Sequence, residues 1–289
     1  MPSSDNALAR LRREIDAVDN AIQDLIVKRT ALVEKVGKNK SRAGGAVLRP
    51  AREAAVLRRL VARHTGAFPA PALIRIWREM MAASAGLQAP LSLAVYVPEG
   101  GAGLIEVARA QYGSLGRLTP YRSAGEVVGA VAEAKSSIGI VPAPRLDDAD
   151  PWWRNLVGSE ASVPPVIARL PFIGSGGDEG PEDGAMALAF AQIEETGDDR
   201  TLIVIEADGE VSRAAINSAL EAAELETYYM DVRKDRGDIR FVLLELKGYF
   251  GQQDARIDRL AARGVPINRV HRIGAFPAPF APASVGLTP

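Results

Sequence analysis

The chain has 289 residues, of which 47% are hydrophobic and 25% are charged, so it can bury a sizeable core and is not a disordered chain. Its length predicts about two domains. The lack of cysteine excludes disulfides and thiolate chemistry, and only two histidines, His64 and His271, argue against a metal site built from histidines. The polar N-terminus and the absence of a long apolar span predict a cytoplasmic protein without a membrane segment.

The net charge of −1 hides an uneven distribution along the chain. Residues 1–90 contain 16 Lys and Arg against 8 Asp and Glu, whereas the remainder contains 19 against 28. A basic N-terminal segment of this kind can bind nucleic acid, a small polyanion or its own acidic partner domain. The charge alone favours none of these.

One long helix is expected over residues 6–42, because apolar side chains recur at alternating spacings of three and four residues. The members of this seam are Leu8, Leu11, Ile15, Val18, Ile22, Leu25, Leu32 and Val36. Arg29 takes one place in the seam, and Lys40 lies eleven residues on, at about the same face. A cation that faces a core needs an anionic partner, so a bound anion is a candidate.

Two shorter helices follow, one from Pro50 to about Gly66 and one from about residue 69 to Gln88. From residue 91 the pattern changes to strands that alternate with helices, which predicts an α/β region. Its strands are expected at 91–97, 118–122, 136–142, 165–173 and 186–193, and its helices at 104–111 and 124–135.

The last 90 residues predict the order βαββαβ of a ferredoxin-like split βαβ unit. Its strands are expected at 201–207, 226–233, 240–246 and 267–274, and its helices at 212–224 and 252–263. Loops are expected at 41–46, 174–184 and 234–238, and an irregular tail from residue 275. The predicted domains are therefore an all-α unit at 1–90, an α/β unit at 91–198 and a ferredoxin-like unit at 199–289.

The length of the first helix predicts a dimer. About 35 helical residues extend about 50 Å, whereas a compact domain of about 90 residues has a radius of gyration of about 12 to 13 Å. A second copy of the chain is the simplest cover for the seam, in an intertwined homodimer. Arg12 and Arg29 lie about 25 Å apart on one helix, so an antiparallel dimer brings Arg12 of one chain towards Arg29 of the other. Two guanidiniums at one site suit two carboxylates.

Further polar residues lie on the two shorter helices. Arg52 and Glu53 are on the second, and Ser84 and Gln88, four residues apart, end the apolar stripe of the third. Together, several motifs resemble the all-helical class of chorismate mutases over about residues 6–90. They are Leu11-Arg12-x-x-Ile15-Asp16-x-x-Asp19, Arg29, Val36-Gly37-Lys38-x-Lys40, Arg52-Glu53 and Ser84-x-x-x-Gln88. The resemblance implies a three-helix protomer in an intertwined dimer.

The resemblance also implies the conversion of chorismate to prephenate, a pericyclic rearrangement in phenylalanine and tyrosine biosynthesis that needs no cofactor and no metal. Arg29, with Arg12 of the other chain, would bind the two substrate carboxylates. Arg52 and Ser84 would help to position a carboxylate. The family often carries an acidic residue ahead of the Arg-Glu pair, where this chain has Arg49 and Pro50.

Three residues are expected to act on the reacting part of the substrate. By resemblance, Lys40 and Gln88 donate hydrogen bonds to the ether oxygen, where negative charge grows. Glu53 accepts a hydrogen bond from the ring hydroxyl. Because residue 88 is Gln and not Glu, no protonated acid is needed, and activity is expected to hold through neutral pH.

The remaining chain is similar, more weakly, to prephenate dehydratase and its regulatory ACT domain, at residues 93–101 and 138–142. However, Ala143-Pro144-Arg145 stands where that family has Glu-Asn-Ser, and the Thr-Arg-Phe motif is missing. Residues 231–234 stand where the phenylalanine-binding motif would fall, and residues 208–212 where the other effector loop would. The sequence thus predicts that dehydratase chemistry is lost, and it leaves an aromatic amino acid open as an effector. Trp152 and Trp153 are expected to pack in a core.

Three alternatives remain open. The chain could be a bifunctional mutase and dehydratase with diverged motifs, or a catalytically dead regulatory subunit. It could also be a helical adaptor that binds nucleic acid or a partner helix. An adaptor for nucleic acid needs basic residues on an exposed face, whereas Arg29 lies in the seam, so neither nucleic acid nor a membrane is the expected partner.

Overall fold

The computed structural model describes the chain except for residues 1–3, 44–46, 102, 147, 149–150, 159–161, 175–183, 210, 235–238, 252–253, 262–265 and 288–289. The side chains of residues 4–5, 40–43 and 261 also lie outside the description. The predicted loops at 41–46, 174–184 and 234–238 fall largely on these residues.

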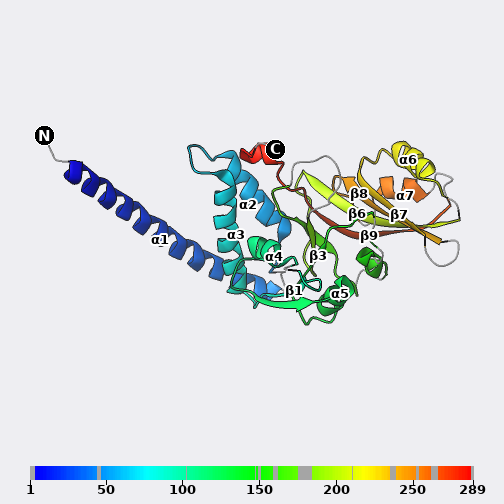
Figure 1. The fold of residues 1–289 in the computed structure, drawn as a ribbon, viewed down its shortest axis with the longest axis horizontal. Coiled ribbons are helices and arrows are strands. Elements are labelled where there is room, and N and C mark those ends of the chain that lie inside the picture. Colours follow the sequence, from blue (N-terminus) through cyan, green and yellow to red (C-terminus); the bar gives the residue numbers. More distant parts are fainter. Residues whose placement is uncertain are drawn as a thin grey trace.

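Three helices make up the N-terminal part, as predicted: α1 (Ser4–Ala43), α2 (Pro50–Ala62) and α3 (Ala70–Gly86). Pro50 opens α2 at its first turn, where a missing backbone N–H costs no hydrogen bond. Figure 1 shows the N-terminal part of α1 extending away from the rest of the molecule. The helices α2 and α3 lie side by side between the C-terminal end of α1 and the sheet. Within the described part of the chain, no helix combines the length and the apolar character that a membrane crossing demands.

The apolar stripe of α1 is exposed in the single chain. Leu25 is 63% exposed and Ile15 59% exposed, and the other seam residues from Leu8 to Val36 are about equally open. A monomeric protein rarely exposes a continuous stripe of this kind. The stripe therefore requires a second surface, in agreement with the helix-length argument.

The rest of the chain forms one nine-stranded sheet in the order β2-β1-β3-β5-β4-β9-β6-β8-β7. Its first half contains β1 (Ser92–Tyr96), β2 (Arg117–Tyr121), β3 (Ile138–Pro142), β4 (Val166–Leu170) and β5 (Ala185–Leu188). β1 pairs in parallel with β2 and β3, and β5 runs antiparallel to β3 and β4. The helices α4 (Ile105–Tyr112) and α5 (Ala124–Ala132) link the parallel strands. A capping box of Ser123 and Glu126 opens α5.

The second half has the predicted ferredoxin-like order. It consists of β6 (Asp199–Asp208), α6 (Arg213–Ala222), β7 (Thr227–Lys234), β8 (Ile239–Lys247), α7 (Ala255–Ala261) and β9 (Ile267–Pro277). All its strand pairs are antiparallel. The two halves join in the sheet where β4 pairs in parallel with β9, at Val166 and Gly274, and a parallel bridge between Ile173 and Phe280 follows farther along both segments.

A core beneath the sheet runs across both halves. The short helix η1 (Trp152–Leu156), which the sequence did not predict, buries Trp152 and Trp153 to 2% and 1% exposure. Their cluster includes Val128 on α5 and Leu243 on β8. The two tryptophans therefore pack against strands from both halves of the sheet, as the packing prediction required.

The prediction of an irregular tail from residue 275 was wrong. β9 continues to Pro277, and the short helix η2 (Pro282–Val285) follows it. Val285 lies in one buried cluster with Leu57 of α2 and Ile74 of α3, and Phe172 and Phe280 meet there edge to face at 5.3 Å. Burial of Val285 explains the order of this Pro- and Ala-rich segment, because apolar contact offsets the entropy of fixing it.

A substitution at Gly274 tests the join between the two halves of the sheet. A Cβ atom at this residue would overlap the backbone of Val166, so Gly274→Ala should lower the free energy of unfolding by about 1 to 3 kcal/mol. Gly129→Ala in α5 is the matched control, because nothing lies within 4 Å of the added atom and alanine favours a helix by about 1 kcal/mol. Urea denaturation measures both, and equal stabilities would contradict the join.

Candidate active site

Arg29 of α1 lies against the polar end of α3. Its Nη1 donates a hydrogen bond to Ser84 Oγ at 2.8 Å, and its guanidinium stacks 5.5 Å from the centre of the Trp77 ring. Ser84 is buried, and its hydroxyl donates in turn to the carbonyl oxygen of Met80 at 2.6 Å. Partial burial lowers the pKa of Arg29 from its ordinary value, and the group stays a cation near neutral pH.

Gln88 completes this group at the junction of α1 and α3. Its amide nitrogen donates to the carbonyl oxygen of Ser84 at 3.3 Å. Gly37 of α1 packs on it so closely that a Cβ atom would stand 3.0 Å from Gln88 Cγ. Lys40 follows Gly37 by three residues and thus lies on the next turn of α1, near the same face; its side chain is outside the described part. The structure therefore brings Arg29, Ser84 and Gln88 together.

Two predicted residues lie apart from this group in the single chain. Arg12 is exposed on the projecting part of α1, at about 1.5 Å per residue some 25 Å from Arg29. Arg52 is exposed on α2. Both positions are open to a second chain.

Glu53 has a partner that the sequence did not identify. Arg78 of α3 donates from Nη1 to Glu53 Oε2 at 2.8 Å, and only 4% of the Arg78 side chain is exposed. The Arg78 guanidinium also lies 4.5 Å from the centre of the Phe172 ring. Burial raises the pKa of Glu53, and the charge of Arg78 opposes that rise. The sequence did contain a sign that Arg78 is buried. Arg78 follows the apolar Ile74 by four residues and interrupts the apolar stripe of α3, as Arg29 interrupts that of α1.

Salt bridges and hydrogen bonds tie α2 to the sheet. Arg49, at the start of α2, pairs with Glu194 at 2.7 Å. Arg58 donates to Thr196 Oγ1 at 2.8 Å and to the carbonyl oxygen of Ala278 at 3.1 Å. The helix that carries Arg52 and Glu53 is thus held by the segment before β6 and by the end of β9.

The α/β half has its own cleft, of about 680 Å³, at the carboxyl ends of β1 and β3. Ligands commonly bind at such ends in α/β sheets. Tyr96, Pro142, Ala143 and Arg145 line it, so Ala143 and Arg145 stand where the dehydratase resemblance expects catalytic side chains. The carbonyl oxygen of Arg145 accepts a hydrogen bond from Arg233 at 2.7 Å.

The expected effector motif at 231–234 is internally paired. Arg233 Nε donates to Asp231 Oδ2 at 2.9 Å, and burial raises the pKa of Asp231. The other effector loop includes residue 210, outside the described part. Across the described residues, no group of three or more His, Asp and Glu side chains is arranged to hold a metal ion.

This arrangement defines a helical N-terminal domain in which one cation, Arg29, a hydroxyl, Ser84, and an amide, Gln88, gather between the long helix α1 and the end of α3. Residues 11–89 match the family model described as chorismate mutase type II. The chain therefore carries a chorismate mutase type II domain at its N-terminus, followed by a mixed α/β region.

Curated relatives match about half of the chain. The bifunctional chorismate mutase/prephenate dehydratase of Aquifex aeolicus is 28% identical over 139 residues, which are 47% of this chain and 38% of that protein. Its namesake from Pseudomonas aeruginosa is 30% identical over 140 residues, with the same two shares. The match thus spans less than half of either relative. Among solved structures, prephenate dehydratase from Streptococcus mutans aligns with a TM-score of 0.47 and 13% identity, over 66% of this chain and 99% of that chain.

The Glu53–Arg78 pair yields a stability prediction. Arg78→Met should lower the free energy of unfolding by about 1 to 3 kcal/mol, because it leaves the partly buried carboxylate of Glu53, 24% exposed, without its partner. Adding Glu53→Leu should recover most of the loss. Arg75→Met, at an exposed residue of the same helix, is the control and should change little.

The pH dependence of the Arg78→Met variant provides a second check. Without Arg78, the pKa of Glu53 rises further in the folded state, so the folded protein takes up a proton more readily than the unfolded chain. The stability loss should therefore shrink as pH falls from about 8 to about 5. A loss that is constant across this range in urea denaturation would contradict the buried pair.

Proposed function

We propose that the N-terminal domain converts chorismate to prephenate, and that the chain is a cytoplasmic enzyme of aromatic amino acid biosynthesis. The observation that carries this proposal is the group of Arg29, Ser84 and Gln88 between α1 and α3, together with the match of residues 11–89 to chorismate mutase type II. The names of the relatives, bifunctional chorismate mutase/prephenate dehydratase, support the same activity.

The rearrangement is unimolecular, so the domain has to hold one conformer and stabilise developing charge. Arg29 and Arg12 of a second chain bind the two carboxylates, and Arg52 and Ser84 position them. Lys40 and Gln88 donate to the ether oxygen as its bond to carbon lengthens. Glu53 accepts from the ring hydroxyl, and its pairing with Arg78 through Oε2 holds the carboxylate in one orientation.

A homodimer completes the site in this proposal. Eight apolar side chains of α1 are about half exposed, and their burial against a second copy supplies on the order of 10 kcal/mol per chain before the cost of association. An antiparallel pairing moves the exposed Arg12 of one chain to Arg29 of the other. The site is then shared, and neither chain has a complete one alone.

A bifunctional enzyme with a diverged dehydratase site is the second candidate. The cleft beside Ala143 and Arg145 favours it, because it lies where α/β sheets bind ligands. Asp148 also lines this cleft, but Ala143, Pro144 and Arg145 replace the Glu-Asn-Ser motif of the dehydratases, so we expect no phenylpyruvate from prephenate. Chromatographic detection of phenylpyruvate with the full-length chain distinguishes the two candidates.

Complementation between two inactive variants tests the shared site. Arg12→Ala and Arg29→Ala should each lower the rate of chorismate consumption by about 10²- to 10³-fold. Their co-expression should restore about one quarter of the wild-type rate, because half of the dimers are mixed and each mixed dimer has one intact site.

Arg13→Ala is the control for this experiment, since Arg13 is an exposed neighbour of Arg12 on α1 and should keep nearly full activity. Co-expressed variants that are no more active than the separate ones would contradict a shared site. A wild-type chain that does not consume chorismate would overturn the mutase proposal itself.

The amide at residue 88 sets the expected pH profile. A glutamine donates at any pH, so wild-type kcat should stay level between about pH 5 and pH 8. In Gln88→Glu only the protonated acid can donate, so kcat should fall as pH rises above the ordinary carboxyl pKa of about 4.3. A sharp loss of wild-type kcat between about pH 5 and pH 7 would contradict the role of Gln88.

A further inference from the structure

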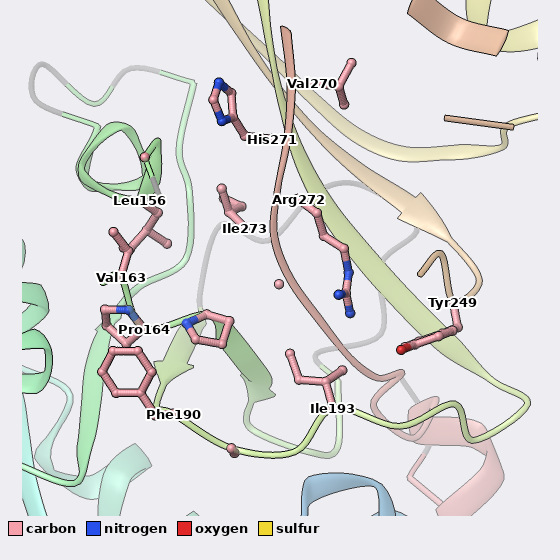
Figure 2. Close-up of a pocket in the computed structure, with 14 residues that line it drawn as sticks. Leu156, Val163, Pro164, Phe190, Ile193, Tyr249, Val270, His271, Arg272 and Ile273 are labelled. Atoms are coloured by element: carbon pink, nitrogen blue, oxygen red, sulfur yellow. The ribbon is translucent and has the colours of Figure 1, made fainter. Parts of the chain in front are cut away.

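A second, larger cleft lies where the two halves of the sheet separate. Residues 270–274 of β9, which end at the residue that pairs with Val166 of β4, line a cleft of about 860 Å³ together with residues 163–165 ahead of β4 (Figure 2). This volume falls within the range of about 300 to 1,000 Å³ that is typical of small-molecule sites. None of the residues that line this cleft is a predicted mutase residue or belongs to the expected effector motif at 231–234.

One wall of the cleft is apolar. Figure 2 shows Leu156, Val163, Pro164 and Phe190 on the same side, with Ile193 at one end. Phe190 is 50% exposed, although an aromatic ring of this size is usually covered. These side chains offer a flat apolar surface to a ligand.

The opposite wall carries Arg272, whose guanidinium points towards Tyr249 in Figure 2 and lies 5.4 Å from the centre of that ring. Its Nε and Nη2 atoms are buried and have no hydrogen-bond partner within the described part of the chain. Arg49, Arg78 and Arg240 also have a buried Nε without a partner, but each donates through another nitrogen to an acceptor. Arg272 has no such bond among the described residues.

The chemistry of these two atoms defines the ligand. Nε and Nη2 form one edge of the guanidinium, and their parallel N–H groups match the two oxygens of a carboxylate. The neighbouring His271 is engaged with Glu206 at 2.5 Å, which leaves Arg272 as the cation for an anion in the cleft. Because the edge is covered, the side chain has to turn away from Tyr249 on binding, which the rotatable bonds of arginine permit.

We propose that this cleft binds a small carboxylate with a flat apolar body. The body packs against Phe190 and Pro164, and the carboxylate forms a bidentate pair with Arg272. A buried cation without an acceptor gains more from such a pair than a solvated one does. The proposal stands apart from the mutase activity, because it concerns binding alone.

Benzoate is the probe, measured by isothermal titration calorimetry with the full-length chain. We expect saturable binding below about 1 mM, and binding of benzyl alcohol, which has the ring without the charge, at least about tenfold weaker. Arg272→Met should weaken benzoate binding at least about tenfold. Arg269→Met, at an exposed residue of the same strand, should bind within about twofold of the wild type, because it leaves the Arg272 pair intact.

Several outcomes would overturn the site. They are no benzoate binding to the wild type at about 10 mM, equal binding by Arg272→Met, or an equal loss in Arg269→Met. Should Arg272→Met fail to fold, Phe190→Ala replaces it, since Phe190 is on the surface of the cleft and half exposed. That variant should weaken benzoate at least about threefold through lost apolar contact, and unchanged affinity would equally refute the proposal.

Discussion

The apolar stripe of α1 is the constraint on which the helical domain depends. Its side chains are about half exposed from Leu8 to Val36, and a helix of 40 residues cannot fold back on a unit of this size. Its C-terminal part touches the rest of the chain, through Arg29 against Ser84 of α3 and Gly37 against Gln88. The position of α1 therefore depends on whatever covers the stripe, and that cover decides where Arg12 lies.

The orientation of α2 and α3 is fixed by their contacts with the sheet. Glu53–Arg78, Arg49–Glu194 and the hydrogen bonds of Arg58 link α2 and α3 to the sheet. A small cluster with Val285 and Phe172 adds apolar contact. Buried ion pairs contribute less to stability than to geometry, because desolvation offsets most of their attraction. These contacts thus fix the orientation of α2 and α3 more than they hold the fold together.

The sequence was sufficient for features that repeat along the chain. The three-four spacing predicted α1, and the alternation of strands and helices predicted the ferredoxin-like order, because both patterns are local. The polar end of the third helix, at Ser84 and Gln88, predicted a polar pocket, and the family resemblance placed Arg29 with these residues; the structure shows Arg29 bonded to Ser84. Reading Arg78 as a cation that interrupts an apolar stripe would have found a buried cation, but not its partner, since spacing does not show which two stripes face each other.

Features that depend on contacts between distant segments could not be predicted from the sequence. The tail after residue 275 is rich in Pro and Ala, and only its contact with α2 and α3 explains η2. The short helix with Trp152 has too few residues for a periodic signal. The parallel pairings of Val166 with Gly274 and of Ile173 with Phe280 join two units that each look separate in the sequence, so the continuous sheet could not be deduced from either one.

The candidate site lies where the two constraints meet. Ser84 and Glu53 are on helices oriented by the sheet, and Gln88 lies in the turn after α3, whereas Arg29 is on the helix whose far end has an exposed apolar stripe. A change in the sheet contacts of α2 moves Glu53 relative to Arg29 without touching either residue. A change along the stripe of α1 moves Arg12 alone. The positions of the charged residues at the candidate site are thus set by two independent interfaces, one polar and within the chain, the other the exposed apolar stripe of α1.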